Sequence, residues 1–345
     1  MLTTELYIDG QWQPGIAGGT IDIIDPATEE QVTTAAQADR ADVEAAINAA
    51  HTAFQSWRQV SGWERSKVLR KTAQLLEERS ERIAHQLTLE TGKPLGQSRA
   101  ELGAAVELID WYADEARRIF GQTLPGRTAN NRFMTIYEPV GVVGAFTAWN
   151  FPVVLQARKI APALATGCTI VTRPAEEGTG AVVELVKCFI DAGAPKGTVN
   201  LVTGLPEVIS ETIMDSDLVR KVTFTGSIPV GQHLMRRAAD TVKRMSMELG
   251  GHAPVIIHED VDPVKTAITA AAGKSRNNGQ VCVSPTRFFV HKKHEKVFNE
   301  TFADALSNMK IGHGLDPDTE IGPLINKKRL DFIEQMVEDT RNEGA

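Results

Sequence analysis

The sequence has few cysteines, no long hydrophobic stretch and only short basic runs. Three cysteines among 345 residues exclude a disulfide scaffold, and an odd number indicates free thiols in a reducing compartment. No stretch approaches the about 20 apolar residues that cross a bilayer, and Met1–Glu5 lacks the basic start and apolar core of a signal peptide. The net charge of −7 argues against a nucleic acid or an anionic membrane as partner. We therefore expect a soluble, cytoplasmic protein.

The remaining composition is that of an ordinary globular protein. Hydrophobic residues make up 42% of the chain, and the modest counts of 28 glycines and 16 prolines exclude a collagen-like or disordered chain. At about 150 residues per domain, the length predicts two domains, each large enough to bury a core.

The N-terminal third combines short strands with long amphipathic helices. Leu6–Asp25 alternates apolar and polar residues around glycine turns, which predicts short strands. Apolar residues at helical spacing then predict three helices, over Arg40–Trp57, Gly62–Thr91 and Pro94–Phe120. An extended segment near residues 121–139 follows, with a strand at Phe133–Tyr137.

Strands and helices alternate from residue 140 onward. The predicted strands are Val140–Phe146, Cys168–Thr172, Val199–Val202, Lys221–Thr225 and Arg244–Glu248. Helices begin between them at Pro152, Gly180, Pro206 and Pro229. Because parallel neighbours need helical crossovers, this series predicts an α/β fold with a doubly wound, Rossmann-like parallel sheet. Ligands of such sheets bind beyond the carboxyl ends of the strands.

A second α/β series starts after Gly250 and Gly251. Its predicted strands are Pro254–Ile257 and Arg287–Val290, and its predicted helices are Pro263–Arg276 and Lys293–Met309. We therefore divide the chain into a nucleotide-binding domain at residues 1–248, interrupted by the extended segment near 121–139, and a second domain at residues 249–345.

Cys282 is the strongest candidate for a reactive side chain. It lies in the loop Asn277–Pro285, where glycine and amide side chains leave a thiol accessible and backbone N–H groups can stabilise a thiolate. Cys168 begins a predicted buried strand, and Cys188 lies on the apolar face of a helix. These two thiols are interpreted as packing residues.

Two further polar residues follow strand ends. Glu248 ends a parallel strand before two glycines, where an acid reaches the ligand crevice; the alternative is a solvated turn acid. Asn150 precedes Phe151 and Pro152 at a helix start. It is either an N-cap or an amide donor for an oxyanion, and the two roles are compatible.

Nucleotide-binding and metal signals are weaker. Gly226 and Ser227 follow a strand and open a helix, where an anion can approach the free N–H groups. Arg173 and Glu176 follow the second strand of the series, where an acid commonly holds ribose hydroxyls. The chain has no zinc motif and no serine-hydrolase elbow, so we expect no metal site.

Four motifs in this order resemble the NAD(P)-dependent aldehyde dehydrogenase superfamily. They are Trp149–Pro152 (WNFP), Phe224–Ser227 (FTGS), Glu248–Gly251 (ELGG) and Gly279–Cys282 (GQVC). The resemblance starts at Ile8–Trp12 and runs to the last residue. Its pattern is closest to the succinate-semialdehyde dehydrogenase-like branch.

The resemblance implies a role for each matching residue. Cys282 would attack the aldehyde to give a thiohemiacetal, Asn150 and the Cys282 N–H would hold the oxyanion, and Glu248 would activate the water that hydrolyses the thioester. The implied cofactor-binding residues are Thr147, Trp149, Lys159, Arg173, Glu176, Gly226, Ser227 and Leu249. Glu176 favours NAD, although Arg173 in place of the usual lysine leaves NADP open. Arg158 would grip the carboxylate of a semialdehyde, or it is a surface helical cation.

Family members continue further than this chain, so the resemblance also implies a catalytic domain that is incomplete at its C-terminus. The full-length form would be a homodimer or homotetramer. Two alternatives remain at this stage. The chain is a thiol esterase that works without cofactor, or a catalytically inactive truncated homologue that binds nucleotide or a full-length partner.

Overall fold

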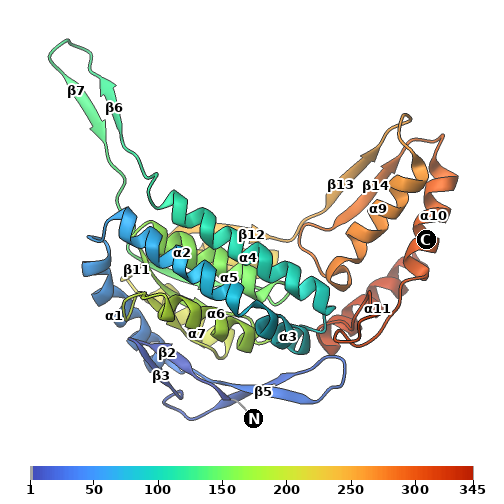
Figure 1. The fold of residues 1–345 in the computed structure, drawn as a ribbon, viewed down its shortest axis with the longest axis horizontal. Helices are drawn as coiled ribbons and strands as arrows, with labels where there is room; N and C mark the ends of the chain where they lie inside the picture. The colour runs from blue at the N-terminus through green and yellow to red at the C-terminus, as the bar shows by residue number, and fades with distance from the viewer. Residues whose placement is uncertain (1–2, 345) are drawn as a thin grey trace.

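A seven-stranded sheet forms the centre of the molecule in the computed structural model, which describes residues 3–344 (Figure 1). Its strand order is β12-β11-β8-β9-β10-β2-β3. The first five strands in that order are parallel, whereas β2 and β3 are antiparallel additions at one edge. The parallel strands are β8 (Val142–Phe146), β9 (Thr169–Arg173), β10 (Val199–Leu201), β11 (Val219–Gly226) and β12 (Arg244–Leu249).

The strand order reverses at the centre of this sheet. The chain runs outward from β8 through β9 to β10, and then crosses back to place β11 on the other side of β8. The loops after β8 and β11 therefore leave the sheet toward opposite faces, which opens a crevice beyond their carboxyl ends. The sequence-based prediction of a doubly wound parallel sheet is confirmed.

Helices cover both faces of the sheet. One face packs against α5 (Pro152–Ala165) and α6 (Thr179–Asp191), and these two helices are covered in turn by α2 (Gly62–Glu78), α3 (Ser80–Thr91) and α4 (Leu95–Glu115). The other face packs against α1 (Arg40–Trp57), α7 (Pro206–Asp215) and α8 (Ile228–Ala239). Two apolar cores result, one on each side of the sheet. Proline at the start of α5 and α7 fits the first helical turn, where its missing N–H group is not needed.

The single helix predicted over Gly62–Thr91 is wrong, because α2 and α3 are separate helices. The break falls at Arg79, which no glycine or proline marks in the sequence. The Arg79 side chain forms an ion pair of 2.7 Å with Asp191 at the end of α6. A tertiary contact therefore accompanies the change of direction.

The N-terminal strands extend the body in two ways. β2 (Leu6–Ile8) and β3 (Gln11–Gln13) form a hairpin whose turn residues, Asp9 and Gly10, have φ of 47° and 85°. β1 (Thr3–Thr4), β4 (Thr20–Ile24) and β5 (Gln31–Ala36) form a separate three-stranded sheet along the lower edge in Figure 1.

Two parts project from the body on the same side in Figure 1. One is a hairpin of β6 (Gln122–Pro125) and β7 (Arg132–Thr135), both of whose strands are exposed. The other contains the parallel pair β13 (Ala253–Ile257) and β14 (Pro285–Val290) with α9 (Pro263–Ser275) and α10 (Glu295–Ser307). A small core around Ile257, Ala267 and Phe298 holds the second part together.

The chain beyond α10 returns to the main body. Leu95 N–H at the start of α4 donates to the Gly314 carbonyl at 2.8 Å, and His313 Nε2 lies 3.3 Å from the Asp25 carboxylate. The last helix, α11 (Lys327–Asn342), then begins beside the β9–α6 turn, where Asn326 Nδ2 donates to Glu177 at 2.8 Å. No helix within residues 3–344 is long and apolar enough to cross a membrane.

Candidate active site

A cavity of about 670 Å³ lies at the point where the strand order reverses. The ends of β8 and β11 contribute Thr147, Trp149, Asn150, Gly226 and Ser227 to its lining. Arg173 and Glu176 after β9, Glu248 on β12 and Cys282 in the loop before β14 complete the predicted residues found there. The fold thus brings nine of the predicted site residues, from four strand ends and one distant loop, into one cavity.

The loop that presents Cys282 has an unusual backbone. Asn277, Asn278 and Gly279, which follow α9 in a short 3₁₀ segment, η1 (Arg276–Gly279), have φ of 49°, 56° and 77°. Asparagine and glycine tolerate this left-handed region better than other residues do, which explains their occurrence here. The turn directs Cys282 back toward the end of the sheet, where its side chain is half-buried.

Cys282 and Glu248 interact directly. Burial raises the pKa of the Cys282 thiol, and the negative charge of Glu248 raises that pKa further. The carboxylate is therefore placed to accept the thiol proton when a substrate arrives. Glu248 points to the same face of β12 as Arg244 and Ser246, because side chains alternate along a strand.

Asn150 points toward the Cys282 loop. Its Nδ2 donates to the Gln280 carbonyl at 3.1 Å, two residues before the thiol. Phe151, not Asn150, occupies the N-cap position of α5, and α5 has no side-chain cap bond. The capping interpretation of Asn150 is therefore wrong, and its amide is directed at the loop that carries the nucleophile candidate.

The far end of the cavity suits a dinucleotide. Ser227 is the N-cap of α8 but forms no side-chain cap bond, so the first N–H groups of this helix remain for an anion. Open space adjoins Gly250, where an added Cβ would meet nothing within 4 Å. Arg173 forms an ion pair with Glu176 and donates to the Gly204 carbonyl at 3.2 Å. These residues fit a cofactor with a pyrophosphate and a ribose.

Sequence reasoning missed two cations in this cavity. Lys328 and Arg329, in the first turn of α11, line it together with the strand-end residues. The Arg329 Nε atom is buried without a hydrogen-bond partner. The only local signal is the basic run Lys327–Arg329, and nothing in that run shows that the chain folds back over a site formed by residues 147–282.

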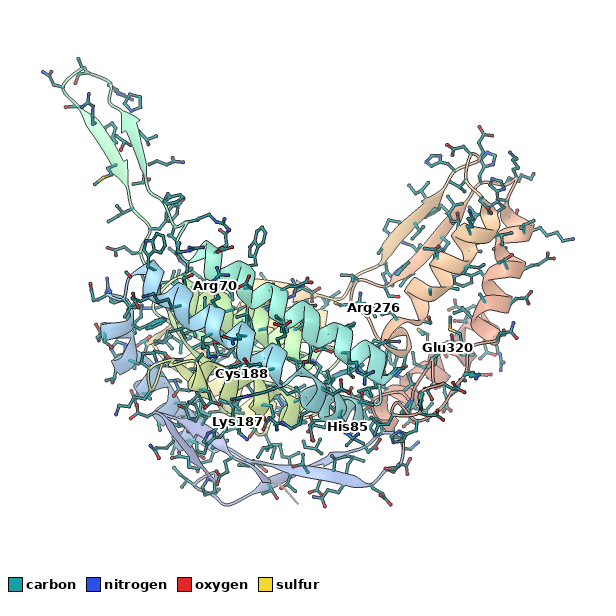
Figure 2. All side chains as sticks on the ribbon, viewed as in Figure 1. Arg70, His85, Lys187, Cys188, Arg276 and Glu320 are labelled. Atoms are coloured by element: carbon teal, nitrogen blue, oxygen red, sulfur yellow. The ribbon has the colours of Figure 1, made fainter. Side chains whose placement is uncertain are left out.

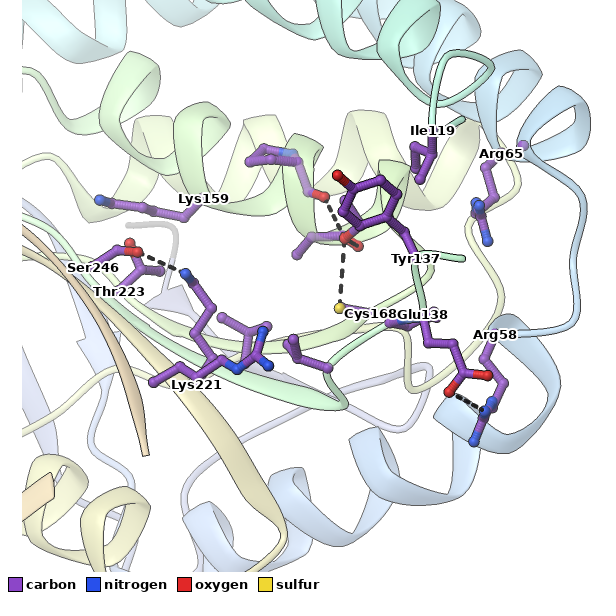
Figure 3. Close-up of a pocket in the computed structure, with 18 of the residues that line it drawn as sticks. Arg58, Arg65, Ile119, Tyr137, Glu138, Lys159, Cys168, Lys221, Thr223 and Ser246 are labelled. Atoms are coloured by element: carbon purple, nitrogen blue, oxygen red, sulfur yellow. Dashed lines mark hydrogen bonds and ion pairs between the residues drawn. The ribbon is translucent and has the colours of Figure 1, made fainter. Parts of the chain in front are cut away.

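Three predicted residues lie outside this cavity. Leu249 packs under α8, where a Cβ added to Gly231 would lie 2.7 Å from its side chain. Arg158 and Lys159 on α5 line a second cavity of about 720 Å³ on the α5 face of the sheet (Figure 3). Burial lowers the pKa of Lys159 to about 8, while the charge of Glu248 opposes this shift. Lys159 therefore lies within electrostatic reach of Glu248.

The second cavity is strongly cationic. Besides Arg158 and Lys159 it is lined by Arg58, Arg65, Lys221 and Arg244, with Glu138 as the one acid in its lining. Figure 3 shows Lys221 reaching Ser246, to which it donates at 2.6 Å. Because Arg244 and Ser246 share a face of β12 with Glu248, the two cavities follow one another along that strand.

The other two cysteines are buried packing residues, as predicted. Cys168 is 3% exposed at the start of β9, and Cys188 is fully buried on α6 within the helical layer (Figure 2). Burial raises the pKa of Cys188 to about 11, which makes its thiol unreactive. No group of three or more His, Cys, Asp or Glu residues that could hold a metal ion occurs between residues 3 and 344.

A thiol, a carboxylate and an amide at the crevice of a doubly wound sheet, where dinucleotides bind, fit a nucleotide-dependent oxidoreductase. A sequence model of the aldehyde dehydrogenase family matches residues 12–345, and the chain belongs to this family. It therefore oxidises an aldehyde to the acid, with NAD or NADP as the hydride acceptor.

Relatives and solved structures agree with this assignment. The chain is 41% identical to a 4-(hydroxymethyl)benzenesulfonate dehydrogenase of Comamonas testosteroni, 39% to a glutarate-semialdehyde dehydrogenase of Pseudomonas putida and 38% to the NADP⁺-dependent succinate-semialdehyde dehydrogenase GabD of Escherichia coli. Each match covers 99% of this chain and 71% of the relative.

Among solved structures, a succinate-semialdehyde dehydrogenase from Burkholderia pseudomallei superposes with a TM-score of 0.96 at 40% identity, covering 99% of this chain and 71% of that one. An NAD⁺ complex of an aldehyde dehydrogenase from Bacillus cereus gives a TM-score of 0.97 at 36% identity, covering 99% and 70%.

Proposed function

We propose that Cys282, Asn150 and Glu248 are the catalytic residues and that the substrate is a small aldehyde with an anionic group at its far end. The observation that carries the proposal is the meeting of these three side chains in the cavity that also contains the uncapped start of α8. A nucleophile, an oxyanion donor and a base are thereby placed beside a dinucleotide site.

In the first half of the reaction, Glu248 takes the thiol proton and the Cys282 sulfur attacks the carbonyl carbon. A C–S bond forms, and the carbonyl π electrons move to oxygen to give a thiohemiacetal anion. The Cys282 N–H and the Asn150 amide hold this oxyanion. One amide hydrogen of Asn150 already bonds to the Gln280 carbonyl, and the amide has a second one to offer. NAD(P)⁺, when bound, would supply the acceptor for the hydride on this carbon, and the acyl group would then remain on Cys282 as a thioester.

The proton that Glu248 took from the thiol passes to solvent, so Glu248 can act again as base in the second half. It removes a proton from a water molecule, and the water oxygen attacks the thioester carbon. The C–S bond then breaks, the acid leaves and the Cys282 thiolate is restored. One carboxylate can serve both steps because it lies beside the sulfur to which the acyl group is attached.

We propose that cofactor binding uses four pairs of residues in the first cavity. Gly226 and Ser227 at the start of α8 would meet the pyrophosphate, and Glu176 with its partner Arg173 would meet the adenosine ribose. Lys328 and Arg329 add positive charge from α11.

Glu176 favours NAD, since its carboxylate repels a 2′-phosphate. Thr147 and Trp149 would line the nicotinamide end beside Asn150. Lys159 and Leu249 would support this site from outside the cavity.

The anionic part of the substrate would lie in the second cavity. We propose that Arg158 holds it, supported by the other cations there. The names of the relatives point the same way, because they describe substrates with a sulfonate or, in the semialdehydes of succinate and glutarate, a carboxylate.

Assembly and location are also proposals. The β6–β7 hairpin exposes Phe133 and Met134, and an isolated two-stranded hairpin is marginally stable, so we propose that it packs against other copies in a homodimer or homotetramer. The three free cysteines support a cytoplasmic location.

We propose residues 1–248 as the NAD(P)-binding domain and residues 249–345 as the catalytic domain.

The test is an assay of NADH or NADPH formation with succinate semialdehyde, glutarate semialdehyde and butanal. Wild type should reduce the cofactor, Cys282→Ala should not, and the matched control Cys188→Ala should keep activity at the temperature where it stays folded. Full activity of Cys282→Ala would contradict the proposed nucleophile.

A further inference from the structure

A buried ion pair contacts the segment that carries Asn150. Lys93, between α3 and α4, and Glu101 on α4 both have side chains that are 0% exposed, and their Nζ and Oε2 atoms are 2.5 Å apart. A buried ion pair is weak as a source of stability, because desolvating two charges offsets most of their attraction, and apolar residues of similar volume often serve as well. The role of this pair is therefore to be sought in what else it contacts.

Lys93 contacts the turn that carries Asn150. Its Nζ donates to the Asn150 backbone carbonyl at 2.8 Å and lies 4.5 Å from the centre of the Phe151 ring. Glu101 contacts the next residues of the same segment. Its Oε1 accepts the N–H groups of Val153 at 2.9 Å and Val154 at 3.2 Å. The pair therefore holds the Asn150 carbonyl and the first turn of α5 that follows it. That helix has no side-chain cap of its own.

The Cys282 loop is attached to the same point. Asn277 Nδ2 donates to the Asn150 carbonyl at 2.8 Å and to the Gln280 carbonyl at 3.1 Å. The Asn277 N–H donates to Gln97 Oε1 on α4 at 2.5 Å. Arg276 reaches over the Phe151 ring at 5.2 Å, at the junction of the two parts of the molecule in Figure 2. Asn150 and the Cys282 loop are thus both tied to α4.

We propose that the Lys93–Glu101 pair and Asn277 are positioning residues that fix the backbone of Asn150 and thereby aim its side-chain amide at the oxyanion formed on Cys282. Two donors on one carbonyl fix the orientation of that peptide group, and the bonds of Glu101 fix the peptide groups that follow. The amide side chain then has one direction relative to the Cys282 loop. This inference rests on the proposed oxyanion role of Asn150.

The test uses acyl transfer that needs no cofactor. Attack of the Cys282 sulfur on p-nitrophenyl acetate forms a C–S bond and releases p-nitrophenolate, while the thiol proton goes to Glu248. This reaction passes through an oxyanion. Alkylation of the same thiol by iodoacetamide displaces iodide and forms no oxyanion, so it measures thiol access and reactivity alone.

The main variant is Lys93→Met combined with Glu101→Gln, which removes both charges but keeps an oxygen to accept the Val153 N–H. We expect acylation to fall by about 10- to 100-fold and alkylation to stay within about twofold. Because this variant alters a buried pair, its unfolding temperature and circular dichroism are measured first. Asn277→Gly is the second variant. It suits the positive φ at this position, removes the other donor to Asn150, and should show the same selective loss.

The matched control is an ion pair between α3 and α4. Arg99 and Glu81 form an exposed pair of 2.6 Å, and Arg99→Met with Glu81→Gln should change neither reaction. Each variant is also combined with Asn150→Ala. If the pair acts through Asn150, its effect on acylation should largely disappear in that background.

Three outcomes would overturn the inference. They are unchanged acylation in both positioning variants, equal loss of acylation and alkylation, and full additivity with Asn150→Ala. Asn150→Ala alone separates the inference from its premise. If it lowers acylation about 100-fold or more while the positioning variants do not, only the positioning role fails. If it leaves acylation unchanged, the proposed oxyanion role is itself wrong and the inference fails with it.

Discussion

The Cys282 thiol and the Glu248 carboxylate lie close together in one cavity, although the two residues belong to different parts of the fold. Glu248 lies on the edge strand β12 of the central sheet, and Cys282 lies in the loop that returns from α9. Burial and the neighbouring negative charge keep the thiol protonated until its proton is removed. Glu248 is therefore both the charge that raises the pKa of the thiol and the base that can remove its proton.

Replacing Glu248 with Gln should separate the two halves of the reaction. Loss of the negative charge should lower the pKa of Cys282, so half-maximal alkylation by iodoacetamide should occur at lower pH than in wild type. At a pH above that value, the first turnover should still give a burst of NADH, while steady-state turnover slows about 100-fold or more for lack of a base. Rapid-mixing measurements of NADH absorbance give both rates. Equal loss of burst and turnover would contradict the hydrolytic role.

Replacing Arg158 with Leu should weaken binding of anionic aldehydes selectively. Arg158 lies among the cations of the second cavity, so its loss should raise KM for succinate semialdehyde about tenfold and leave KM for butanal unchanged. The matched control is Arg99→Leu, at an exposed arginine on α4 away from this cavity. Equal rises of KM for both aldehydes would show that Arg158 does not bind the anionic group.

Replacing Arg329 with Gln should weaken dinucleotide binding. The arginine lines the first cavity and has a buried Nε without a partner, so an anion there would gain a charged donor. We expect the Kd of NAD⁺, measured by quenching of tryptophan fluorescence, to rise about three- to tenfold and to depend less on salt. Arg341→Gln, at the exposed far end of the same helix, should leave Kd unchanged. Equal effects of the two substitutions would contradict a local contact.

Replacing Glu90 with Gln should change how stability depends on pH. The carboxyl group is buried at the start of α6, and burial raises its pKa from 4.5 to about 7, although the Gln86 amide and the N–H groups of Ala181 and Gly180 bond to it. The folded state therefore binds this proton more tightly than the unfolded state. The stabilisation is fully present below pH 4.5 and is lost as the pH rises through about 7.

Wild type should accordingly lose on the order of 3 kcal/mol of unfolding free energy relative to Glu90→Gln across this interval. Urea titrations at several pH values measure the difference. Parallel curves for the two proteins would show that Glu90 does not titrate in this range.

Much of the fold could be predicted from short stretches of sequence. Most of the parallel strands are short apolar runs, and proline marks the first turn of α5, α7 and α8 between them, so local propensity and hydrophobic period agree there. The break at Arg79 could not be found in this way, because it has no punctuating residue and is accompanied by a contact with Asp191, 112 residues further along the chain.

The candidate site divides in a similar way. Cys282, Glu248 and Asn150 could be named from the sequence because each lies in a recognisable motif, in a loop or near the end of a strand. Lys93, Glu101 and Asn277 could not, since nothing local shows that a lysine in the turn after α3 binds the carbonyl of Asn150. The cavities also separate residues that lie close together in the sequence. Trp149 lines the first, whereas Arg158 and Lys159 on the adjoining helix face the second.

The sequence by itself determined the alternation of strands and helices along the chain and the identity of the candidate thiol, acid and amide. These features depend on the local hydrophobic period and on residue chemistry. Only the tertiary structure decided that Arg329 lines the first cavity and that Lys93 and Glu101 bind the backbone at Asn150 and after it. It also decided which cavity each cation lines. Those relationships depend on contacts between residues far apart in the chain, which are fixed by packing and strand register.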